Sequence, residues 1–221
     1  MKTVYAGTHW DDAAFAARLD EAATRVQLLE RPARTLQPGA YRAALAPAAM
    51  AELLGTLGWS GFSLKARRTG VSSLMRLQRG EAAFAPGFHL EEAFARSTTP
   101  AFSPEGFTRP DAVVLVDDGR LPATGGTLNS PRSAVEYAVP ATGAHGGESP
   151  EALHLHGGSI PDADLLRVLG TGLYISNLWY LNYSDRAACR MTGMTRYACF
   201  WVEDGELVAP LNVMRFDDDV L

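Results

Sequence analysis

The turn signal Asp204-Gly205, set between two apolar segments near the C-terminus, constrains the fold more than any other feature of the sequence. An Asp-Gly pair accommodates the positive φ angles of a type I′ turn, which joins adjacent antiparallel strands. Residues 197–202 supply a strand before the turn, and residues 207–209 supply the returning strand. Pro210 limits further pairing because proline has no amide hydrogen to donate. The sequence therefore predicts a β-hairpin in this region.

Other segments favour strands as well, among them the short segment 41–45. Residues 172–183 are dense in Leu, Ile, Trp and Tyr, which predicts a strand buried on both faces. Residues 113–116 precede Asp118-Gly119, the pattern of a strand that enters a tight turn. Residues 153–156 alternate apolar and polar side chains, as a half-buried strand does. These strands lie mostly in the later part of the chain.

Helical patterns are found mainly in the early part of the chain. Pro47 fits a first helical position, and Ser159 is a candidate N-cap of a short late helix. Apolar residues at helical spacing predict helices over 11–29, 47–57, 61–77 and 160–169. Residues 122–150 are rich in Gly, Pro, Ser and Thr, which predicts mostly long loops.

The order of these patterns predicts an α+β fold, with helices in the N-terminal part and a mainly antiparallel sheet in the C-terminal part. Prolines and a glycine interrupt the helical pattern between residues 31 and 39. We therefore assign residues 1–35 to an N-terminal helix and connector, and residues 36–221 to a C-terminal domain. A helix that leads into a connector also raises the expectation of a domain before it.

Charge and cysteine content limit the function classes. The formal net charge of -5 argues against a general nucleic-acid binder, because phosphate contacts need a basic surface. Cys189 and Cys199 are the two cysteines, too few for a disulfide framework. The sequence shows neither a signal-peptide pattern nor an apolar run of about 18 residues. We expect a cytoplasmic protein that binds neither membranes nor nucleic acid.

The histidine pattern lacks the metal helix of zinc peptidases. Such a helix starts with a His-Glu pair and places two imidazoles on one face, with the glutamate as base. No His-Glu pair occurs in this sequence. His154 and His156 are the remaining metal candidates, since residues two apart on a strand share a face. His145 or Asp162 is a possible third ligand, and a plain polar strand face is the alternative interpretation.

Cys189 is a second candidate for chemistry. It lies between Arg186 and Arg190, and nearby cations lower the pKa of a thiol. A nucleophilic cysteine also needs a base and an orienting group, and no local motif supplies them. We interpret Cys189 and Cys199 as structural.

The C-terminal segments together resemble a known family. They are 172–183 (GLYISNLWYLNY), 192–196 (TGMTR), 200–207 (FWVEDGEL) and 210–216 (PLNVMRF). Upstream, 36–45, 59–62 (WSGF) and 113–119 (VVLVDDG) continue the same ordered pattern. The set resembles the C-terminal half of the TldD/PmbA metallopeptidase family, and it is closer to the PmbA or TldE subunit.

The resemblance implies a two-subunit cytoplasmic protease. In such a family TldD carries a His-Glu-x-x-x-His metal helix, and the PmbA-like subunit lacks that site. The implied role for this chain is a non-catalytic subunit that assists proteolysis of peptides, with no cofactor of its own. Its implied partners are a TldD-like catalytic subunit or a second copy of the chain, in an oligomer.

Residues for peptide binding are predicted from their place beside the aromatic strands. Asn182, Thr195 and Arg196 are polar residues that flank these strands, and they are the candidates for contact with an extended peptide. Side chains that only stabilise a turn are the alternative. Two other functions stay open: a self-contained metal-dependent hydrolase that uses His154 and His156, and a DNA-related modulator protein of the kind associated with the PmbA name.

Overall fold

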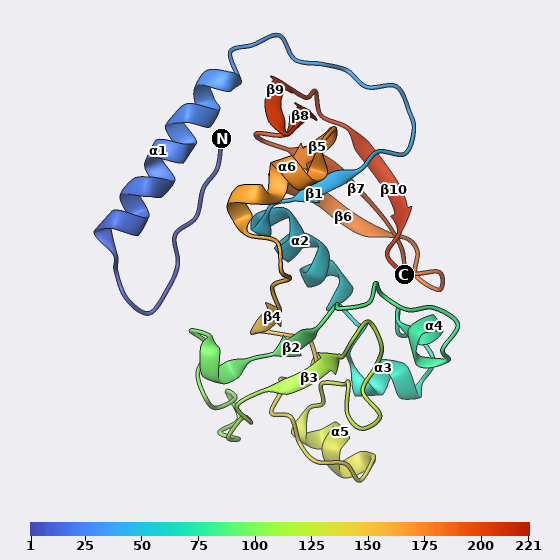
Figure 1. Ribbon diagram of the computed structural model, residues 1–221. Coiled ribbons are helices and arrows are strands. Elements are labelled where there is room, and N and C mark those ends of the chain that lie inside the picture. The colour runs from blue at the N-terminus through green and yellow to red at the C-terminus, as the bar shows by residue number, and fades with distance from the viewer. The chain divides into compact units, whose positions relative to one another are not determined.

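The computed structural model describes residues 1–221 and has the predicted α+β composition (Figure 1). The helices are α1 (Asp12–Leu28), α2 (Pro47–Leu57), α3 (Leu64–Arg68), α4 (Met75–Gln78), α5 (Pro131–Glu136) and α6 (Leu165–Leu169), with short 3-10 helices at Phe94–Arg96 and Asp162–Asp164. The strands are β1 (Ala43–Leu45), β2 (Leu90–Glu92), β3 (Val113–Val116), β4 (Leu153–Leu155), β5 (Gly172–Ile175), β6 (Asn177–Asp185), β7 (Arg190–Arg196), β8 (Phe200–Glu203), β9 (Glu206–Pro210) and β10 (Arg215–Asp219).

The strands form three sheets, and the chain divides into two compact units. The sheet orders are β1-β5-β8-β9, β10-β7-β6 and β3-β2-β4. The first unit comprises Met1–Leu53, Ser159–Asn182 and Thr192–Phe216, and the second comprises Leu54–Gly158, Tyr183–Met191 and Asp217–Leu221. The predicted boundary between residues 35 and 36 stays a prediction.

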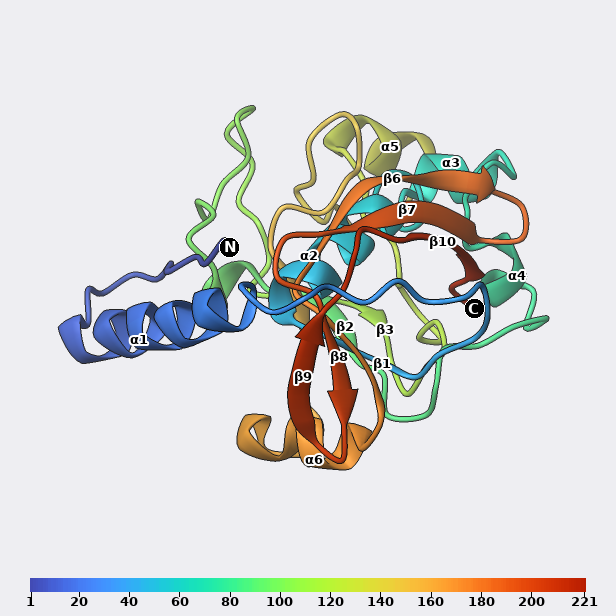
Figure 2. The same cartoon turned by 90° about the horizontal axis from the view of Figure 1, so that it is seen from above.

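The first unit contains the predicted hairpin. Strands β8 and β9 pair antiparallel around Asp204 (φ 51°) and Gly205 (φ 82°), so both turn residues have the positive φ that a type I′ turn requires (Figure 2). The Gly205 amide donates to the Gly170 carbonyl oxygen at 2.8 Å, which attaches the turn to the end of α6. The hairpin prediction is confirmed.

Strand β5 is the buried centre of the first unit. It pairs parallel with β1 and antiparallel with β8, and all four of its residues are buried. Tyr174 packs with Phe200 and Val202 on one face, whereas Leu173 and Ile175 pack on the other. Truncating a buried Phe to Ala costs about 3–5 kcal/mol and a buried Leu or Ile to Ala about 2–5 kcal/mol, so each face contributes substantially to stability.

The predicted single strand over 172–183 is wrong, because the structure divides it at Ser176 into β5 and β6. The Ser176 hydroxyl donates to the Arg196 carbonyl oxygen at 3.2 Å, and β6 continues in a different sheet. Strand β6 forms one edge of that sheet, and most of its residues are exposed or half-buried. Periodicity alone did not reveal this change of sheet.

Helix α1 confirms the first predicted helix. The Asp11 side chain accepts a hydrogen bond from the Ala14 amide at 3.0 Å, an N-cap that satisfies one free amide of the first turn. No residue of α1 is fully buried, and Leu19 and Val26 on its apolar stripe are exposed. The helix pattern was therefore correct, while the burial that it suggested is absent.

Two other helix predictions are corrected. The helix expected over 61–77 is two short helices, α3 and α4, because Gly70 takes a φ of 77° between them. The candidate cap Ser159 does not cap the late helix, since the preceding 3-10 helix begins after Pro161 and α6 has no side-chain cap bond. Gly170, at φ 70°, ends α6 as expected.

The region expected to be long loops, residues 122–150, also contains a helix. Helix α5 starts at Pro131, and the Ser130 side chain accepts from the Ser133 amide at 3.2 Å. Ser-Pro at a cap and first helical position is a signal that was present in the sequence. No helix in the structure has both the length and the apolar character of a membrane span.

Candidate functional site

Strands β2 and β4 of the second unit pair antiparallel, and their register determines which side chains meet. Glu91 lies directly opposite His154. Since directly opposed residues project on the same face of a sheet, the carboxylate and the imidazole are neighbours. His156 follows His154 by two positions, and its amide continues the ladder by donating to the His89 carbonyl oxygen at 3.0 Å. One face therefore carries a carboxylate and two imidazoles.

These three side chains form the triad, our name for Glu91, His154 and His156. One potential ligand atom from each lies within 4.8 Å of the others. The His156 Nε2 and Glu91 Oε1 atoms are 3.5 Å apart, and the His154 and His156 ring centroids are 5.1 Å apart. Glu91 is buried, His154 is half-buried and His156 is exposed. Two imidazoles and one carboxylate form a donor set that fits a divalent transition metal.

Arg96, in the 3-10 helix that follows β2, forms an ion pair with Glu91. Desolvation, followed by the positive charge of Arg96 and the neighbouring His156 ring, lowers the pKa of His154 below its ordinary value. The shift favours the neutral imidazole, the form in which a ring nitrogen donates its lone pair to a metal.

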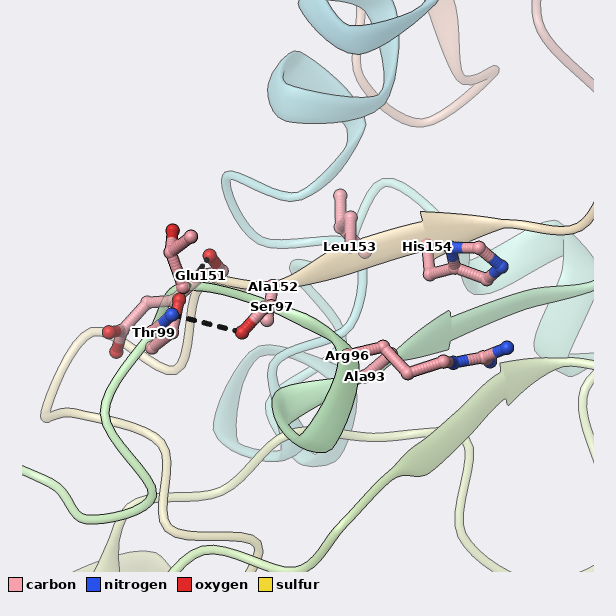
Figure 3. Close-up of a pocket in the computed structure, with 9 residues that line it drawn as sticks. Ala93, Arg96, Ser97, Thr99, Glu151, Ala152, Leu153 and His154 are labelled. Carbon is pink, nitrogen blue, oxygen red and sulfur yellow. Dashed lines mark hydrogen bonds between the residues drawn. The ribbon is translucent and has the colours of Figure 1, made fainter. Parts of the chain in front are cut away.

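A cleft of about 330 Å³ begins at His154. In Figure 3 the Arg96 and His154 side chains on its wall point the same way, and the Thr99 amide donates to the Ser97 Oγ at 3.0 Å. Glu151 lines the cleft as well. Small-molecule sites usually occupy about 300–1,000 Å³, so the cleft has room for a small polar ligand beside the triad.

The sequence predicted part of this arrangement. The structure brings His154 and His156 together, and Glu91 takes the place for which His145 or Asp162 was expected. The His145 Nδ1 instead accepts the Gly147 amide at 2.9 Å, and Asp162 begins a 3-10 helix of the first unit. Glu91 was missed because its position depends on pairing between segments about sixty residues apart in sequence.

Glu92 points to the other face of β2 and is almost fully buried. Its Oε1 accepts the amides of Glu151 at 2.6 Å and Ala152 at 2.9 Å. Burial raises the pKa of Glu92, while these amide hydrogen bonds act in the opposite direction. Glu92 attaches the segment before β4 to β2, which is a structural role.

Glu148 is a third buried acid, with 2% of its surface exposed. It accepts hydrogen bonds from the Ser63 hydroxyl at 2.7 Å, the Lys65 amide at 2.9 Å and the Ser130 amide at 3.1 Å. Burial alone would raise the pKa of Glu148, but the donors around it, including Ser133, lower it below the ordinary value. Because Ser63 and Ser130 cap α3 and α5, Glu148 joins two helix starts.

The three predicted peptide-binding residues lie on β6 and β7 in the first unit. Asn182 is exposed on β6. Thr195 is buried, and its Oγ1 accepts the Met214 amide at 3.0 Å, so its hydroxyl is used within the sheet. The Arg196 guanidinium lies 3.8 Å from the Trp179 ring centroid and 4.9 Å from that of Tyr197. Their role in peptide binding stays a prediction.

Cys189 has the opposite chemistry from that of an activated thiol. Burial raises the pKa of Cys189 to about 11, although the nearby Arg76 charge acts to lower it. Cys189 and Cys199 are both free and buried. A thiol with this pKa is protonated at neutral pH and is a poor nucleophile, in agreement with its structural interpretation.

Known proteins share the sequence pattern and the fold of this chain. Residues 38–221 match the family model described as the PmbA/TldA metallopeptidase C-terminal domain. TldE from Thermococcus kodakarensis is similar over 93% of this chain and 47% of its own, with a TM-score of 0.75 and 15% identity. No curated protein sequence matches the chain.

Two bacterial structures share the fold as well. A proposed modulator of a DNA gyrase from Thermotoga maritima is similar over 88% of this chain and 44% of its own, with a TM-score of 0.68 and 17% identity. Another proposed modulator of DNA gyrase, from Bacteroides thetaiotaomicron, is similar over 91% and 44%, with the same TM-score and identity. This chain spans less than half the length of these solved relatives. The family model covers most of the sequence, and the chain belongs to the TldD/PmbA metallopeptidase family through its C-terminal domain.

Proposed function

We propose that this chain is a non-catalytic component of a TldD/PmbA-type peptidase and assists the cleavage of peptide substrates. A TldD-like partner supplies the metal that activates water. The fold similarity to an archaeal TldE supports this assignment, since the family model alone does not distinguish the two kinds of subunit. The observation that carries the proposal is an exposed aromatic surface beside the edge strand β6.

This surface, called the aromatic edge, consists of Trp179, Tyr180, Arg196 and Tyr197 in the first unit. Trp179 and Tyr180 on β6 are 52% and 79% exposed, and Tyr197 is 42% exposed. Tyr180 has a φ of 58°, a conformation that is rare for a bulky residue. Contiguous exposed apolar surface on a protein often marks a contact site for another chain.

An extended peptide fits such an edge. The free amide and carbonyl groups of an edge strand pair with a peptide main chain, and adjacent side chains select among peptides. Arg196, stacked against Trp179, holds the indole in place and leaves a positive charge for a peptide carboxylate. Asn182 lies further along β6, where its exposed side chain is a second polar candidate for peptide contact. Peptide capture at this edge would raise the local substrate concentration for a bound TldD-like subunit.

A reconstitution assay tests the proposal. The full chain, the TldD-like subunit of the same organism and their mixture are compared for cleavage of an unstructured peptide library by mass spectrometry. We expect the mixture to cleave peptides, the chelator EDTA to stop it, and this chain alone to be inactive. Chelator-sensitive cleavage by the chain alone would contradict the non-catalytic role and favour the self-contained hydrolase.

Variants locate the contribution of the aromatic edge. The double substitution Trp179→Ala/Arg196→Ala is expected to weaken cleavage by the mixture about tenfold, the cost of losing one aromatic contact. Val135→Ala, which removes an exposed apolar side chain of α5, is the matched control and should leave cleavage unchanged. Equal cleavage by both variants would exclude the edge as the peptide site, and a stable homodimer without TldD-like binding would exclude the proposed partner.

The descriptions of two bacterial relatives keep a DNA-related role as a rival. The net charge of -5 opposes direct contact with DNA phosphates. Fluorescence anisotropy with a labelled DNA duplex at low salt tests for this role. Binding that weakens steeply with salt would favour the DNA-related role, and no binding under these conditions would remove it.

A further inference from the structure

We propose that Glu91, His154 and His156 form a binding site for a divalent transition-metal ion of the Zn²⁺ type. The proposal concerns this chain's own second unit and is independent of the metal that a TldD-like subunit would carry. It rests on three ligand atoms that lie within 4.8 Å of one another on one face of the β2-β4 ladder.

The backbone already holds the ligands near the required spacing. Zn²⁺ binds imidazole nitrogen and carboxylate oxygen at about 2.0–2.2 Å in a tetrahedral arrangement, which places neighbouring ligand atoms about 3.4 Å apart. The His156 Nε2 and Glu91 Oε1 atoms are 3.5 Å apart without any adjustment. His154 is fixed opposite Glu91 by the strand register, and its ligand atom lies within 4.8 Å of those of Glu91 and His156.

The donor chemistry selects the metal. Two imidazoles favour Zn²⁺, Co²⁺ or Ni²⁺, whereas Mg²⁺ and Ca²⁺ prefer all-oxygen sites. Three protein ligands leave a fourth position of a tetrahedral ion for water or a ligand atom. That position would be accessible to solvent, because His156 is exposed and His154 lines the cleft.

Arg96 acts as the competitor of the ion. Its guanidinium is paired with the Glu91 carboxylate, and a divalent ion would meet that positive charge at short range. The Arg96 side chain is 54% exposed, so it is able to turn away into water when a metal binds. Removing Arg96 should therefore strengthen metal binding, an effect that a purely structural Glu91–Arg96 pair does not produce.

Metal titration of the intact chain tests the proposal. Protein freed of metal by chelation is titrated with Zn²⁺ by calorimetry, with Co²⁺ by visible absorption, and with Mg²⁺ as a negative probe. We expect one Zn²⁺ per chain, tetrahedral Co²⁺ absorption bands, and no binding of Mg²⁺. Absence of Zn²⁺ binding by the folded wild-type chain would overturn the site.

Four variants separate the site from adventitious binding. We expect His154→Ala/His156→Ala to weaken Zn²⁺ binding by more than about 100-fold, and Glu91→Gln by at least about tenfold, since even outer contacts of metal sites contribute 10–100-fold. Arg96→Ala should bind Zn²⁺ more tightly than the wild type. His9→Ala removes an exposed imidazole of the first unit and should match the wild type. Circular dichroism checks the folding of each variant, and wild-type affinity in the folded double variant, or weaker binding by Arg96→Ala, would refute the proposal.

Discussion

Glu148 and Glu91 are both buried carboxylates of the second unit, but their surroundings differ in kind. Two backbone amides and two serine hydroxyls donate to Glu148, and those donors belong to the starts of α3 and α5. Glu91 faces side chains, the guanidinium of Arg96 and the imidazole of His156, which are themselves exposed. A carboxylate held by backbone donors stabilises a fold, whereas one held by exposed side chains is able to exchange its partner for a ligand.

The largest expected effect concerns Glu148. Glu148→Ala leaves the Lys65 and Ser130 amides without their acceptor, and we expect a loss of about 3 kcal/mol in the free energy of unfolding. Urea denaturation followed by circular dichroism measures it. Glu81→Ala, which removes an exposed acid paired with Arg79 at 3.9 Å, is the control and should cost less than about 1 kcal/mol. Equal losses in Glu148→Ala and Glu81→Ala would show that Glu148 stabilises the fold no more than an exposed acid does.

The triad should show a ligand effect that Glu148 lacks. Zn²⁺ at about 100 times its dissociation constant is expected to raise the free energy of unfolding by about 2.7 kcal/mol, because the ion binds the folded state preferentially. Thermal unfolding with and without Zn²⁺, and again after chelation with EDTA, measures the change. The gain should be absent in His154→Ala/His156→Ala. In the wild type, removal of the metal should return the free energy of unfolding to its value without Zn²⁺. A gain of the same size in the double variant would mean that the ion binds elsewhere.

The dependence of stability on pH should differ between Glu148 and Glu92. Hydrogen bonds lower the pKa of Glu148 in the folded state, so the unfolded chain takes up a proton more readily as pH falls. The stability that Glu148 contributes is therefore complete above its unfolded pKa of about 4.3 and is lost as pH falls below it. Glu148→Gln should flatten this acid limb of a stability–pH curve measured by urea denaturation. An acid limb unchanged in Glu148→Gln would contradict the assignment.

Glu92 should show the reverse sign. Burial raises its pKa, so its favourable contribution is complete below the unfolded pKa and is lost as pH rises through the folded pKa. Glu92→Gln removes the buried charge and should leave stability at pH 7 equal to or slightly above that of the wild type. A large loss at pH 7 would show that the ionised form of Glu92 stabilises the fold.

The sequence predicted local elements better than contacts between distant segments. The reason is the separation in sequence between the residues that interact. Local signals were sufficient for the Asp204-Gly205 hairpin, for α1 and for the strand that carries His154, since each depends on neighbours in the chain. The chain changes sheet at Ser176, whose hydroxyl donates to the carbonyl oxygen of Arg196, twenty residues later. Glu91 similarly becomes a partner of His154 only through strand pairing.

Glu148, in the region 122–150 that was expected to be loops, also depends on contacts between distant segments. Nothing near it in sequence marks it as buried, because its donors come from residues 63–65 and 130. The Ser130-Pro131 pair is a local cap signal, whereas the contact between this cap and Glu148 arises only from tertiary packing. Local sequence patterns predicted the helices and strands, whereas tertiary contacts determined which of their side chains lie together in a site.

The smallest expected effect completes the comparison at Glu91. Glu91→Gln keeps the size of the side chain and removes a charge whose partner Arg96 is exposed, so we expect a change of less than about 1 kcal/mol in the free energy of unfolding. Urea denaturation measures it without metal, beside Glu148→Gln, which replaces an acceptor of four donors and should cost more. The same Glu91→Gln protein should lose most of the Zn²⁺ stabilisation described above. A small change in the free energy of unfolding together with a large loss of Zn²⁺ stabilisation would identify Glu91 as a metal ligand. A large loss of stability with metal binding intact would instead make Glu91 a structural acid like Glu148.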